Sequence, residues 1–348
     1  MAFNINIIPF IFNIMKGIFM KVLHIGKKGN PERFSKADSL IKKAEIIDMP
    51  NGLSADEYLS KGFECEHIIA DAIAEVPASL INAMPFLKSI HSEGVAYNKI
   101  DLNAAKKNNV VVCHSVAMNA SAVAEQTILL MDGLIKNILV NDRAVRSGNQ
   151  ITAKEAYMQN GNLYELSDCI VGLVGFGNIA RAVTRLLTAY GVEHIYYYKR
   201  NRLSNEEEKQ LGVEYKSLSE LLGLSDIVSL HLPVTPASEK IANKGFFSQM
   251  KKGSYFVNTA RGELVDDNAL ASALISGHIK MAGLDTMNNE PVSKDNYLLT
   301  IPDIKDQILL SPHIGGITAS SFRRSYAMIW EDIETVRKGE LPKRAVNL

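Results

Sequence analysis

The sequence predicts an α/β protein with two parallel-sheet domains, the first flavodoxin-like and the second a Rossmann-type dinucleotide-binding domain. Three observations predict this fold. Short apolar runs alternate with helix-like segments over residues 20–117, and a second such series covers residues 169–311. Between an apolar run and an amphipathic segment of that second series lies a G-x-G-x-x-A pattern, at residues 175–180. Alternating strands and helices indicate parallel pairing with right-handed crossovers.

The first series begins at Met20. Its strands are expected at residues 22–25, 46–47, 67–70, 87–91 and 110–113. The apolar run that precedes it, from Ile5, is interrupted by Pro9, Lys16 and Gly17 and is too broken for a membrane span. It also lacks a basic start and a small-x-small cleavage site, so residues 1–19 are left out of the fold prediction.

The glycine turn lies at the centre of the second series. Gly175 allows a sharp turn, Gly177 lets a pyrophosphate approach the backbone, and Ala180 is small enough for close packing of the helix on the strand. The helix then begins at Asn178 and Ile179, whose free N–H groups and partial positive charge suit phosphates.

Six strands are expected in this series, at residues 169–174, 194–198, 227–230, 254–258, 281–284 and 308–310. A helix is predicted over 120–139 that is apolar around most of its circumference, which predicts burial between domains or subunits. A last amphipathic helix is predicted over 318–338.

Composition narrows the functional classes. The 38 basic and 38 acidic side chains of the 348-residue chain balance, so no net field attracts nucleic acid or a membrane, and a small metabolite is the expected partner. The cysteines Cys65, Cys113 and Cys169 sit singly in apolar runs, which predicts core thiols in a reducing, cytoplasmic setting. No metal site is predicted.

Several segments, in order, carry a family resemblance. They are Ser92-Glu-Gly-Val, Ala122-Val-Ala-Glu125, the Gly175 turn, the segments 225–233 and 257–262, Gly283-Leu-Asp285 with Glu290-Pro291, and Ser311-Pro-His-Ile-Gly-Gly316. In this order the chain resembles the D-isomer-specific 2-hydroxyacid dehydrogenases from about residue 85 to its end. The resemblance implies a substrate domain over 20–117, completed by the C-terminal helix within 315–348. It also implies a Rossmann domain over 118–314 inserted into the first, with the active site in the cleft between them.

Three residues match the family's catalytic Arg, Glu and His: Arg261, Glu290 and His313. A guanidinium fork can hold the carboxylate and adjacent carbonyl of a 2-keto acid. His313 as imidazolium can protonate the carbonyl oxygen while hydride arrives at carbon, and Glu290 can orient the ring. Each residue alone has an ordinary structural explanation, as a strand-end cap, a solvated loop or a half-buried histidine. Their joint order beside a nucleotide turn favours catalysis.

The resemblance also implies binding residues. Backbone N–H groups around Glu93, Gly94 and Val95 are expected to bind the substrate carboxylate, and Asp285 is expected to meet the nicotinamide carboxamide. The matched segments add three further cofactor contacts: His231, Pro233 and Thr259.

The chain departs from the family pattern at His114, Ala96 and Lys136, where relatives usually have Asn, Gly and Arg. These changes leave the substrate open. The favoured function is reduction of a short 2-keto acid such as glyoxylate or hydroxypyruvate. One alternative is 3-phosphoglycerate dehydrogenase, which needs cationic side chains to bind the phosphate of its substrate; only Lys99 lies near Gly94 in the sequence. The other is a dinucleotide-sensing interaction protein on the same fold. Formate dehydrogenase is disfavoured, because it usually carries Gln where Glu290 stands.

The cofactor is expected to be NADP(H) rather than NAD(H). An NAD-specific Rossmann unit ends its second strand with an acidic residue about 20 residues beyond the glycines. Here Tyr198 occupies that place, followed by Lys199, Arg200 and Arg202, which offer charge-assisted donors to a 2′-phosphate. Arg200 is the expected main contact; the alternative is a solvated basic loop. The apolar helix 120–139, in a region that the resemblance assigns to a two-fold interface, predicts a homodimer.

Overall fold

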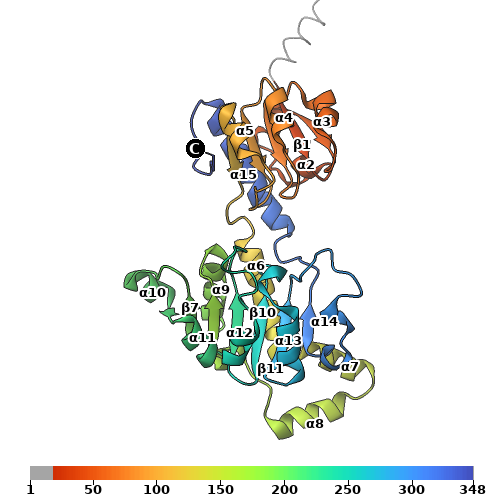
Figure 1. The fold of residues 1–348 in the computed structure, drawn as a ribbon, viewed down its shortest axis with the longest axis vertical. Coiled ribbons are helices and arrows are strands. Elements are labelled where there is room, and N and C mark those ends of the chain that lie inside the picture. Colours follow the sequence, from red (N-terminus) through yellow and green to blue (C-terminus); the bar gives the residue numbers. More distant parts are fainter. Residues whose placement is uncertain (1–18, 348) are drawn as a thin grey trace, which may run out of the picture. The chain divides into compact units, whose positions relative to one another are not determined.

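The computed structural model describes residues 19–347, which form two compact units, and each unit holds one sheet (Figure 1). Unit 1 comprises residues up to Met118 together with those from Ala319 onward, and unit 2 comprises Asn119–Thr318. The α/β fold with two parallel sheets confirms the predicted class. The apolar run excluded above lies, except for its last two residues, outside the described part of the chain.

Unit 1 is a five-stranded parallel sheet in the order β2-β1-β3-β4-β5, which is the flavodoxin-like order. The strands are β1 (Met20–Ile25), β2 (Ala44–Met49), β3 (His67–Ala70), β4 (Ser89–Ser92) and β5 (Val111–His114). The helices are α2 (Asn30–Phe34), α3 (Ala55–Gly62), α4 (Ala78–Ala83), α5 (Leu102–Lys107) and α15 (Ala319–Arg337), with a 3₁₀ turn at Leu40–Lys43.

The sheet of unit 1 is covered on both faces, which is why its strands are apolar throughout. Side chains of α3, α4 and α5 form one core with the strands, and α15 joins α2 in a second core on the opposite face. Tyr326, Ile329, Trp330 and Ile333 are the buried stripe of α15. Each such side chain contributes about 1.5–3 kcal/mol by leaving water. The predicted helix 318–338 is therefore confirmed, and the chain after it continues along β5, where the Val346 N–H donates to Val112 O at 2.8 Å.

Unit 2 is a seven-stranded parallel sheet in the order β12-β11-β10-β9-β6-β7-β8. Its strands are β6 (Val171–Val174), β7 (Ile195–Tyr198), β8 (Glu214–Tyr215), β9 (Ile227–Leu230), β10 (Ser254–Asn258), β11 (Ile279–Leu284) and β12 (Ile308–Leu310). The predicted count of six was wrong by one, because β8 has only two residues and no apolar run. It exists through its pairing with β7 at Tyr196 and Tyr197.

The helices of unit 2 lie on both faces of this sheet (Figure 1). They are α6 (Ala120–Ile135), α7 (Ile138–Arg146), α8 (Gln150–Asn160), α9 (Asn178–Ala189), α10 (Asn205–Leu211), α11 (Leu218–Leu224), α12 (Lys244–Gln249), α13 (Asp267–Ile275) and α14 (Tyr297–Thr300). Short 3₁₀ turns lie at Leu166–Asp168, Gly262–Leu264 and Pro302–Ile304. No helix in the described residues is long and apolar enough to cross a membrane.

The helix predicted over 120–139 is shorter than expected. α6 ends at Ile135, and Asn137 adopts a left-handed conformation with φ 49° before α7 begins. Most of the apolar circumference of α6 is buried within unit 2, where it packs on α9, β10 and β11. Gly283 on β11 permits the close approach, since a Cβ there would lie 3.1 Å from Leu130 Cβ. Leu129 remains 62% exposed.

Candidate active site

The strand order of unit 2 reverses between β6 and β9, and the glycine turn follows β6 at this point. Gly175 has φ +95°, and a Cβ on it would lie 2.5 Å from the carbonyl oxygen of His231, the residue after β9. Its N–H donates to Tyr198 O at the end of β7 at 2.9 Å. Because ligands of open α/β sheets bind outside the strand ends at such a reversal, this edge of unit 2 is the candidate cofactor site.

Helix α9 presents its amino end beside this turn. Its N-cap is Gly177, which offers no side-chain cap, and a Cβ at Gly177 would meet nothing within 4 Å. The first N–H groups of the helix, at Asn178 and Ile179, therefore open onto free space. Ala180 is fully buried against the sheet, as the small residue of the motif requires. The positive end of a twelve-residue helix at an open turn fits a pyrophosphate.

Two buried polar atoms at this edge have no hydrogen-bond partner among the described residues, His231 Nε2 after β9 and Thr286 Oγ1 after β11. Burial lowers the pKa of His231 to about 4, so its ring is neutral at physiological pH. Unsatisfied buried polar atoms are uncommon and costly, and a ligand that hydrogen-bonds them removes the cost. The residues present at this edge thus fit a dinucleotide.

The end of β7 carries the basic cluster 199–202. Lys199 is half-buried and Arg200 is exposed, and neither has an ion-pair partner among the described residues. Arg202 is different, because its Nε and Nη2 donate to both carboxylate oxygens of Glu208 at 2.8 and 2.7 Å. Glu208 also accepts from Tyr197 Oη at 2.6 Å. Arg202 is thus already paired within unit 2, and its predicted support of a phosphate stays a prediction that falls to the donors outside this pair.

Two other sequence-predicted cofactor residues are already engaged within unit 2. Thr259 is 6% exposed, and its hydroxyl lies 2.9 Å from that of Thr127 on α6. The Pro233 carbonyl accepts from Ser238 Oγ at 2.7 Å. These two hydrogen bonds already occupy the Thr259 hydroxyl and the Pro233 carbonyl, so a cofactor would contact other atoms of the two residues or share these ones.

Arg261 follows β10 and is exposed at the strand-end edge. Buried Asn258 fixes the turn before it, since its Nδ2 donates to Arg261 O at 2.8 Å and its Oδ1 accepts from Ala260 N at 3.0 Å. Gly262 permits the next close approach, because a Cβ there would lie 2.1 Å from the Met287 carbonyl. The guanidinium donates to Ala260 O through Nη1 at 2.7 Å, so its other donors remain for an anion.

Glu290 and His313 form a direct pair, from the loops after β11 and β12. His313 Nδ1 lies 2.6 Å from Glu290 Oε2, and Glu290 Oε1 accepts from Met287 N at 3.0 Å. The His313 side chain is 44% exposed and that of Glu290 34%. With Nδ1 held by the carboxylate, Nε2 of His313 is the ring atom left for a reacting group.

Asp285 secures the loop that carries His313. It is 3% exposed and accepts three hydrogen bonds, from Ser311 Oγ at 2.6 Å, Ile314 N at 3.0 Å and Gly315 N at 2.9 Å. Gln126 Nε2 on α6 donates to the same Ser311 hydroxyl at 2.8 Å. The sequence pointed to Asp285 as a cofactor contact, and the structure adds an anchoring role that Gln126 and Ser311 share.

The substrate loop predicted at residues 93–95 follows β4 in unit 1. Glu93 does not offer its N–H there, because that group donates to Ala70 O at 2.7 Å, and its side chain is 2% exposed. The predicted donor at Glu93 is therefore already engaged within unit 1. Gly94 N donates weakly to Ser92 Oγ at 3.2 Å, and Val95 is 40% exposed. His114, which the sequence marked as a departure, holds the Val95 carbonyl at 2.8 Å.

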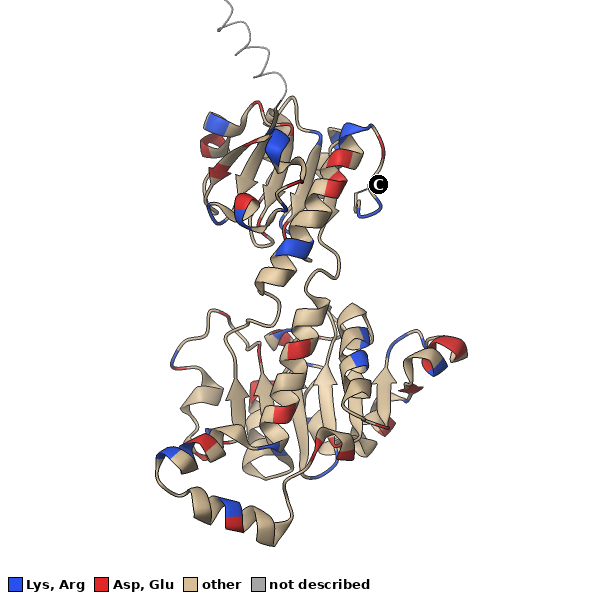
Figure 2. Ribbon diagram, turned by 180° about the vertical axis from the view of Figure 1, so that it is seen from behind, with Lys and Arg blue, Asp and Glu red and all other residues tan. Residues whose placement is uncertain are grey.

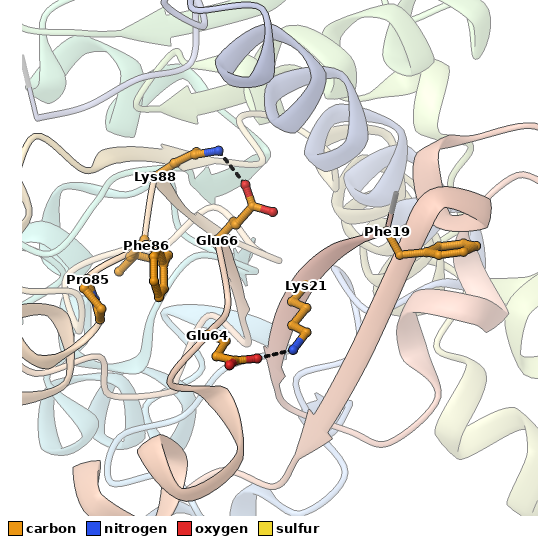
Figure 3. A pocket seen from close by; sticks show the side chains of 8 residues that line it. Phe19, Lys21, Glu64, Glu66, Pro85, Phe86 and Lys88 are labelled. Carbon is orange, nitrogen blue, oxygen red and sulfur yellow. Dashed lines mark hydrogen bonds and ion pairs between the residues drawn. The ribbon is translucent and has the colours of Figure 1, made fainter. Parts of the chain in front are cut away.

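A cavity of about 530 Å³ in unit 1 lies elsewhere (Figure 3). It is lined by residues at or just before the starts of β1, β3 and β4, among them Phe19, Phe86 and the ion pair of Lys88 with Glu66 at 2.5 Å. These are the amino ends of the strands, at the opposite edge of the sheet from residues 93–95. The cavity is therefore unrelated to the predicted substrate loop.

Comparison with known proteins agrees with this geometry. The family model described as "D-isomer specific 2-hydroxyacid dehydrogenase, NAD binding domain" matches residues 128–315. A glyoxylate reductase of Thermofilum pendens is 33% identical over 84% of this chain and 85% of its own length. A D-3-phosphoglycerate dehydrogenase of Archaeoglobus fulgidus is 31% identical over 89% of this chain but only 57% of its own length.

A solved structure shows the same fold. The NAD-complexed D-isomer specific 2-hydroxyacid dehydrogenase of Lactobacillus delbrueckii ssp. bulgaricus aligns with a TM-score of 0.81 and 25% identity, covering 94% of this chain and all of that one. The strand-end edge of unit 2, its glycine turn and the match over more than half of the chain lead to one assignment. The chain belongs to the D-isomer-specific 2-hydroxyacid dehydrogenases and is an oxidoreductase with an NAD-binding domain.

Proposed function

We propose that this enzyme reduces a short 2-keto acid to the D-2-hydroxy acid, with Arg261 as the carboxylate-binding residue and His313 as the proton donor. The observation that carries the proposal is the His313–Glu290 pair, 2.6 Å apart, at the same strand-end edge as Arg261. A carboxylate on Nδ1 favours the protonated ring and turns Nε2 outward.

The chemistry that a bound nicotinamide would supply here is a hydride for the carbonyl carbon. As the C=O double bond becomes a single bond, the oxygen takes the Nε2 proton of His313, and the product is the alcohol. Arg261 holds the carboxylate and limits rotation about the bond to the carbonyl, so the reacting carbon stays aligned. The N–H group of Val95, and that of Gly94 in exchange for its long bond to Ser92 Oγ at 3.2 Å, are proposed as further donors to that carboxylate.

We infer a substrate of the glyoxylate or hydroxypyruvate type rather than a phosphorylated one. Two relatives named above act, by name, on glyoxylate and on 3-phosphoglycerate. A phosphate needs cations, and Lys99, the cation nearest the loop in sequence, is paired with Glu75 at 2.7 Å. That ion pair leaves the loop without an obvious phosphate contact and favours the smaller acid.

NADP(H) is proposed as the preferred cofactor. Tyr198 ends β7 where a carboxylate would exclude a 2′-phosphate, and Arg200 with Lys199 supplies free positive charge beside it. Glu208 forms an ion pair with Arg202 and so does not neutralise Lys199 or Arg200. The charge of those two residues at the end of β7 therefore stays positive.

A homodimer in the cytoplasm is also proposed. Exposed apolar side chains gather on α6, α7 and α8, where Leu129, Ile138, Ile151 and Met158 are 62%, 51%, 61% and 75% exposed. Such a surface is covered in oligomers. Segments with acidic and with basic residues alternate along the ribbon of both units (Figure 2), and the 38 basic and 38 acidic side chains balance, so we expect no nucleic-acid partner. The free, buried cysteines suit a reducing compartment.

The test measures turnover of a panel of 2-keto acids with NADPH and with NADH, using the absorbance of the reduced nicotinamide. The panel includes glyoxylate, hydroxypyruvate, pyruvate and phosphohydroxypyruvate. We expect the highest kcat/KM with a short unphosphorylated acid and NADPH. Oxidation of D- but not L-hydroxy acids in the reverse direction checks the stereochemistry. Turnover confined to the phosphorylated acid would favour the phosphoglycerate alternative. No turnover with any acid would favour a dinucleotide-sensing role.

A further inference from the structure

A cluster of buried polar side chains lies beneath the predicted substrate loop of unit 1. It consists of His24 on β1, Asp48 on β2, Glu93 after β4 and Tyr326 on α15. His24 and Tyr326 are fully buried, and Glu93 is 2% exposed. His24 Nε2 lies 2.9 Å from Glu93 Oε1, and His24 Nδ1 bonds Asp48 Oδ1. The Tyr326 hydroxyl donates to the same Glu93 oxygen.

The geometry favours the doubly protonated ring of His24. Each ring nitrogen faces a carboxyl oxygen, and an ionised carboxylate only accepts hydrogen bonds, so with Asp48 and Glu93 ionised both nitrogens are donors. A neutral imidazole has one N–H and one lone pair, and would set that lone pair against a carboxylate. Burial by itself lowers the pKa of His24, but its hydrogen bonds to Glu93 and Asp48 outweigh burial and raise the pKa above its ordinary value.

Glu93 connects this cluster to the loop. Besides the side-chain contacts, its N–H donates to Ala70 O at 2.7 Å and its carbonyl accepts from Ser325 Oγ at 2.5 Å. The residue is thus held at its backbone and at its carboxylate, directly before Gly94 and Val95. Gly94 follows in a tight passage, since a Cβ there would lie 2.6 Å from Ala72 Cβ. Movement of Glu93 would therefore move the N–H groups that follow it.

We propose that the His24 imidazolium is a positioning residue for substrate binding: through Glu93 it fixes the loop at residues 93–95 and neutralises a buried carboxylate beside the incoming anion. This inference rests on the proposed 2-keto acid reduction. Without the proton on His24, the Glu93 charge would be uncompensated next to the substrate carboxylate, and one of the two ring contacts would become repulsive. Substrate affinity depends on that proton, whereas the chemical step belongs to His313.

The groups around His24 favour one direction of pH dependence. Asp48 and Glu93 face the ring directly, and the Tyr326 hydroxyl lies 3.5 Å from Nε2. Glu32 on α2 helps to raise the pKa of Tyr326. Asp71 is a further acidic neighbour, because a Cβ on Gly26 would lie close both to His24 Nε2, at 2.9 Å, and to Asp71 Cβ, at 3.6 Å. The groups named here that bear on the ring are acidic and favour its protonated form, so His24 loses its proton at a pH above its ordinary pKa. Substrate affinity is then expected to fall as the pH rises.

The experiment measures kcat and KM for the preferred 2-keto acid from pH 6 to 10 in the wild type, His24→Gln and the double variant His24→Gln/Glu93→Gln. We expect the wild-type KM to rise on the alkaline side. In His24→Gln the KM at pH 7 should already be roughly tenfold higher, with kcat changed less than about threefold. The double variant, which removes both charges and keeps a donor opposite an acceptor, should recover most of the affinity and lose the alkaline rise in KM.

His67→Gln is the matched control. His67 is also fully buried in this sheet, but its Nδ1 bonds the Ser89 hydroxyl rather than a carboxylate, and burial lowers its pKa to about 4. It should keep the wild-type KM profile. An independent readout is nitrogen-detected NMR of the imidazoles, in which His24 should carry protons on both ring nitrogens at pH 7.

A single ring proton at pH 7, a pH-independent wild-type KM, or an equal loss of affinity in His24→Gln and His67→Gln would each overturn the inference. Active wild type with unchanged His24→Gln kinetics would overturn this inference alone. A wild type that reduces no 2-keto acid would overturn the proposed function as well. If His24→Gln fails to fold, the wild-type KM profile and the NMR measurement still decide.

Discussion

His313 Nδ1 lies 2.6 Å from Glu290 Oε2, and His313 makes this contact from a backbone with φ 54°. A non-glycine residue at positive φ is uncommon and costs about 1 kcal/mol or more. Asp285 offsets this cost, because its carboxylate binds Ser311 and the two N–H groups directly after His313. The ring is therefore presented by an anchored loop rather than by a flexible one.

The pair predicts the effect of Glu290→Gln. Gln keeps the size and a hydrogen-bonding oxygen but removes the charge that favours the imidazolium. We expect the variant to retain part of kcat and to lose activity at a lower pH than the wild type in the direction of reduction. The pH profile of kcat/KM measures this, and identical acidic and basic limits in both proteins would argue against the role of Glu290.

Substitutions at Arg261 and at His313 should affect different kinetic constants. Arg261→Lys should lose kcat/KM by roughly a hundredfold, since an ammonium cannot make the two-pronged contact, and His313→Ala should lose most of kcat. Circular dichroism and thermal unfolding control for folding. Near-normal turnover in both folded variants would refute the catalytic assignment.

Asp285→Ala should impair catalysis through the His313 loop. It removes three hydrogen bonds at once and leaves the donors of Ser311, Ile314 and Gly315 without their partner. We expect kcat to fall by roughly tenfold or more and the loop at residues 311–315 to exchange its amide hydrogens faster. Gln126→Ala, which touches only the Ser311 hydroxyl, is the milder companion variant. Unchanged exchange in Asp285→Ala would show that the loop is anchored by other means.

Arg200 and Arg202 form a matched pair for cofactor choice. Arg200→Ala should lower the ratio of kcat/KM for NADPH over NADH by roughly tenfold, because a charge-assisted contact to the 2′-phosphate is lost. Arg202→Ala should leave that ratio nearly unchanged and lower stability, because Glu208 would keep only its Tyr197 contact. A wild type that prefers NADH, or equal harm to both cofactors in Arg200→Ala, would require withdrawal of the phosphate site.

The exposed apolar surface of α6 to α8 predicts the assembly state. Sedimentation of the wild type should show a dimer at micromolar concentration, and Ile151→Glu with Met158→Glu should shift it toward monomer. Ile275→Glu, at a side chain 55% exposed on α13, is the control and should remain dimeric. A wild type that sediments only as monomer would contradict the homodimer.

Much of this protein was determined by its sequence alone. The strands at 67–70, 227–230, 254–258 and 308–310 were predicted residue for residue, because buried parallel strands are apolar on both faces and leave a local signal. The glycine turn and the order of Arg261, Glu290 and His313 were also evident, since backbone conformation and catalysis both restrict residue type. These features identified the class of the fold and the candidate reaction.

The tertiary structure decided what depends on partners distant in the chain. β8 exists only through its pairing with β7, and α6 stops at Ile135 although the apolar pattern continues. The Glu93 carboxylate meets His24, 69 residues earlier, and Arg202, which is predicted to support a phosphate, pairs with Glu208; neither contact could be predicted from the sequence. The sequence states which side chains are charged, but the partner that each charged side chain binds depends on which groups the fold brings next to it.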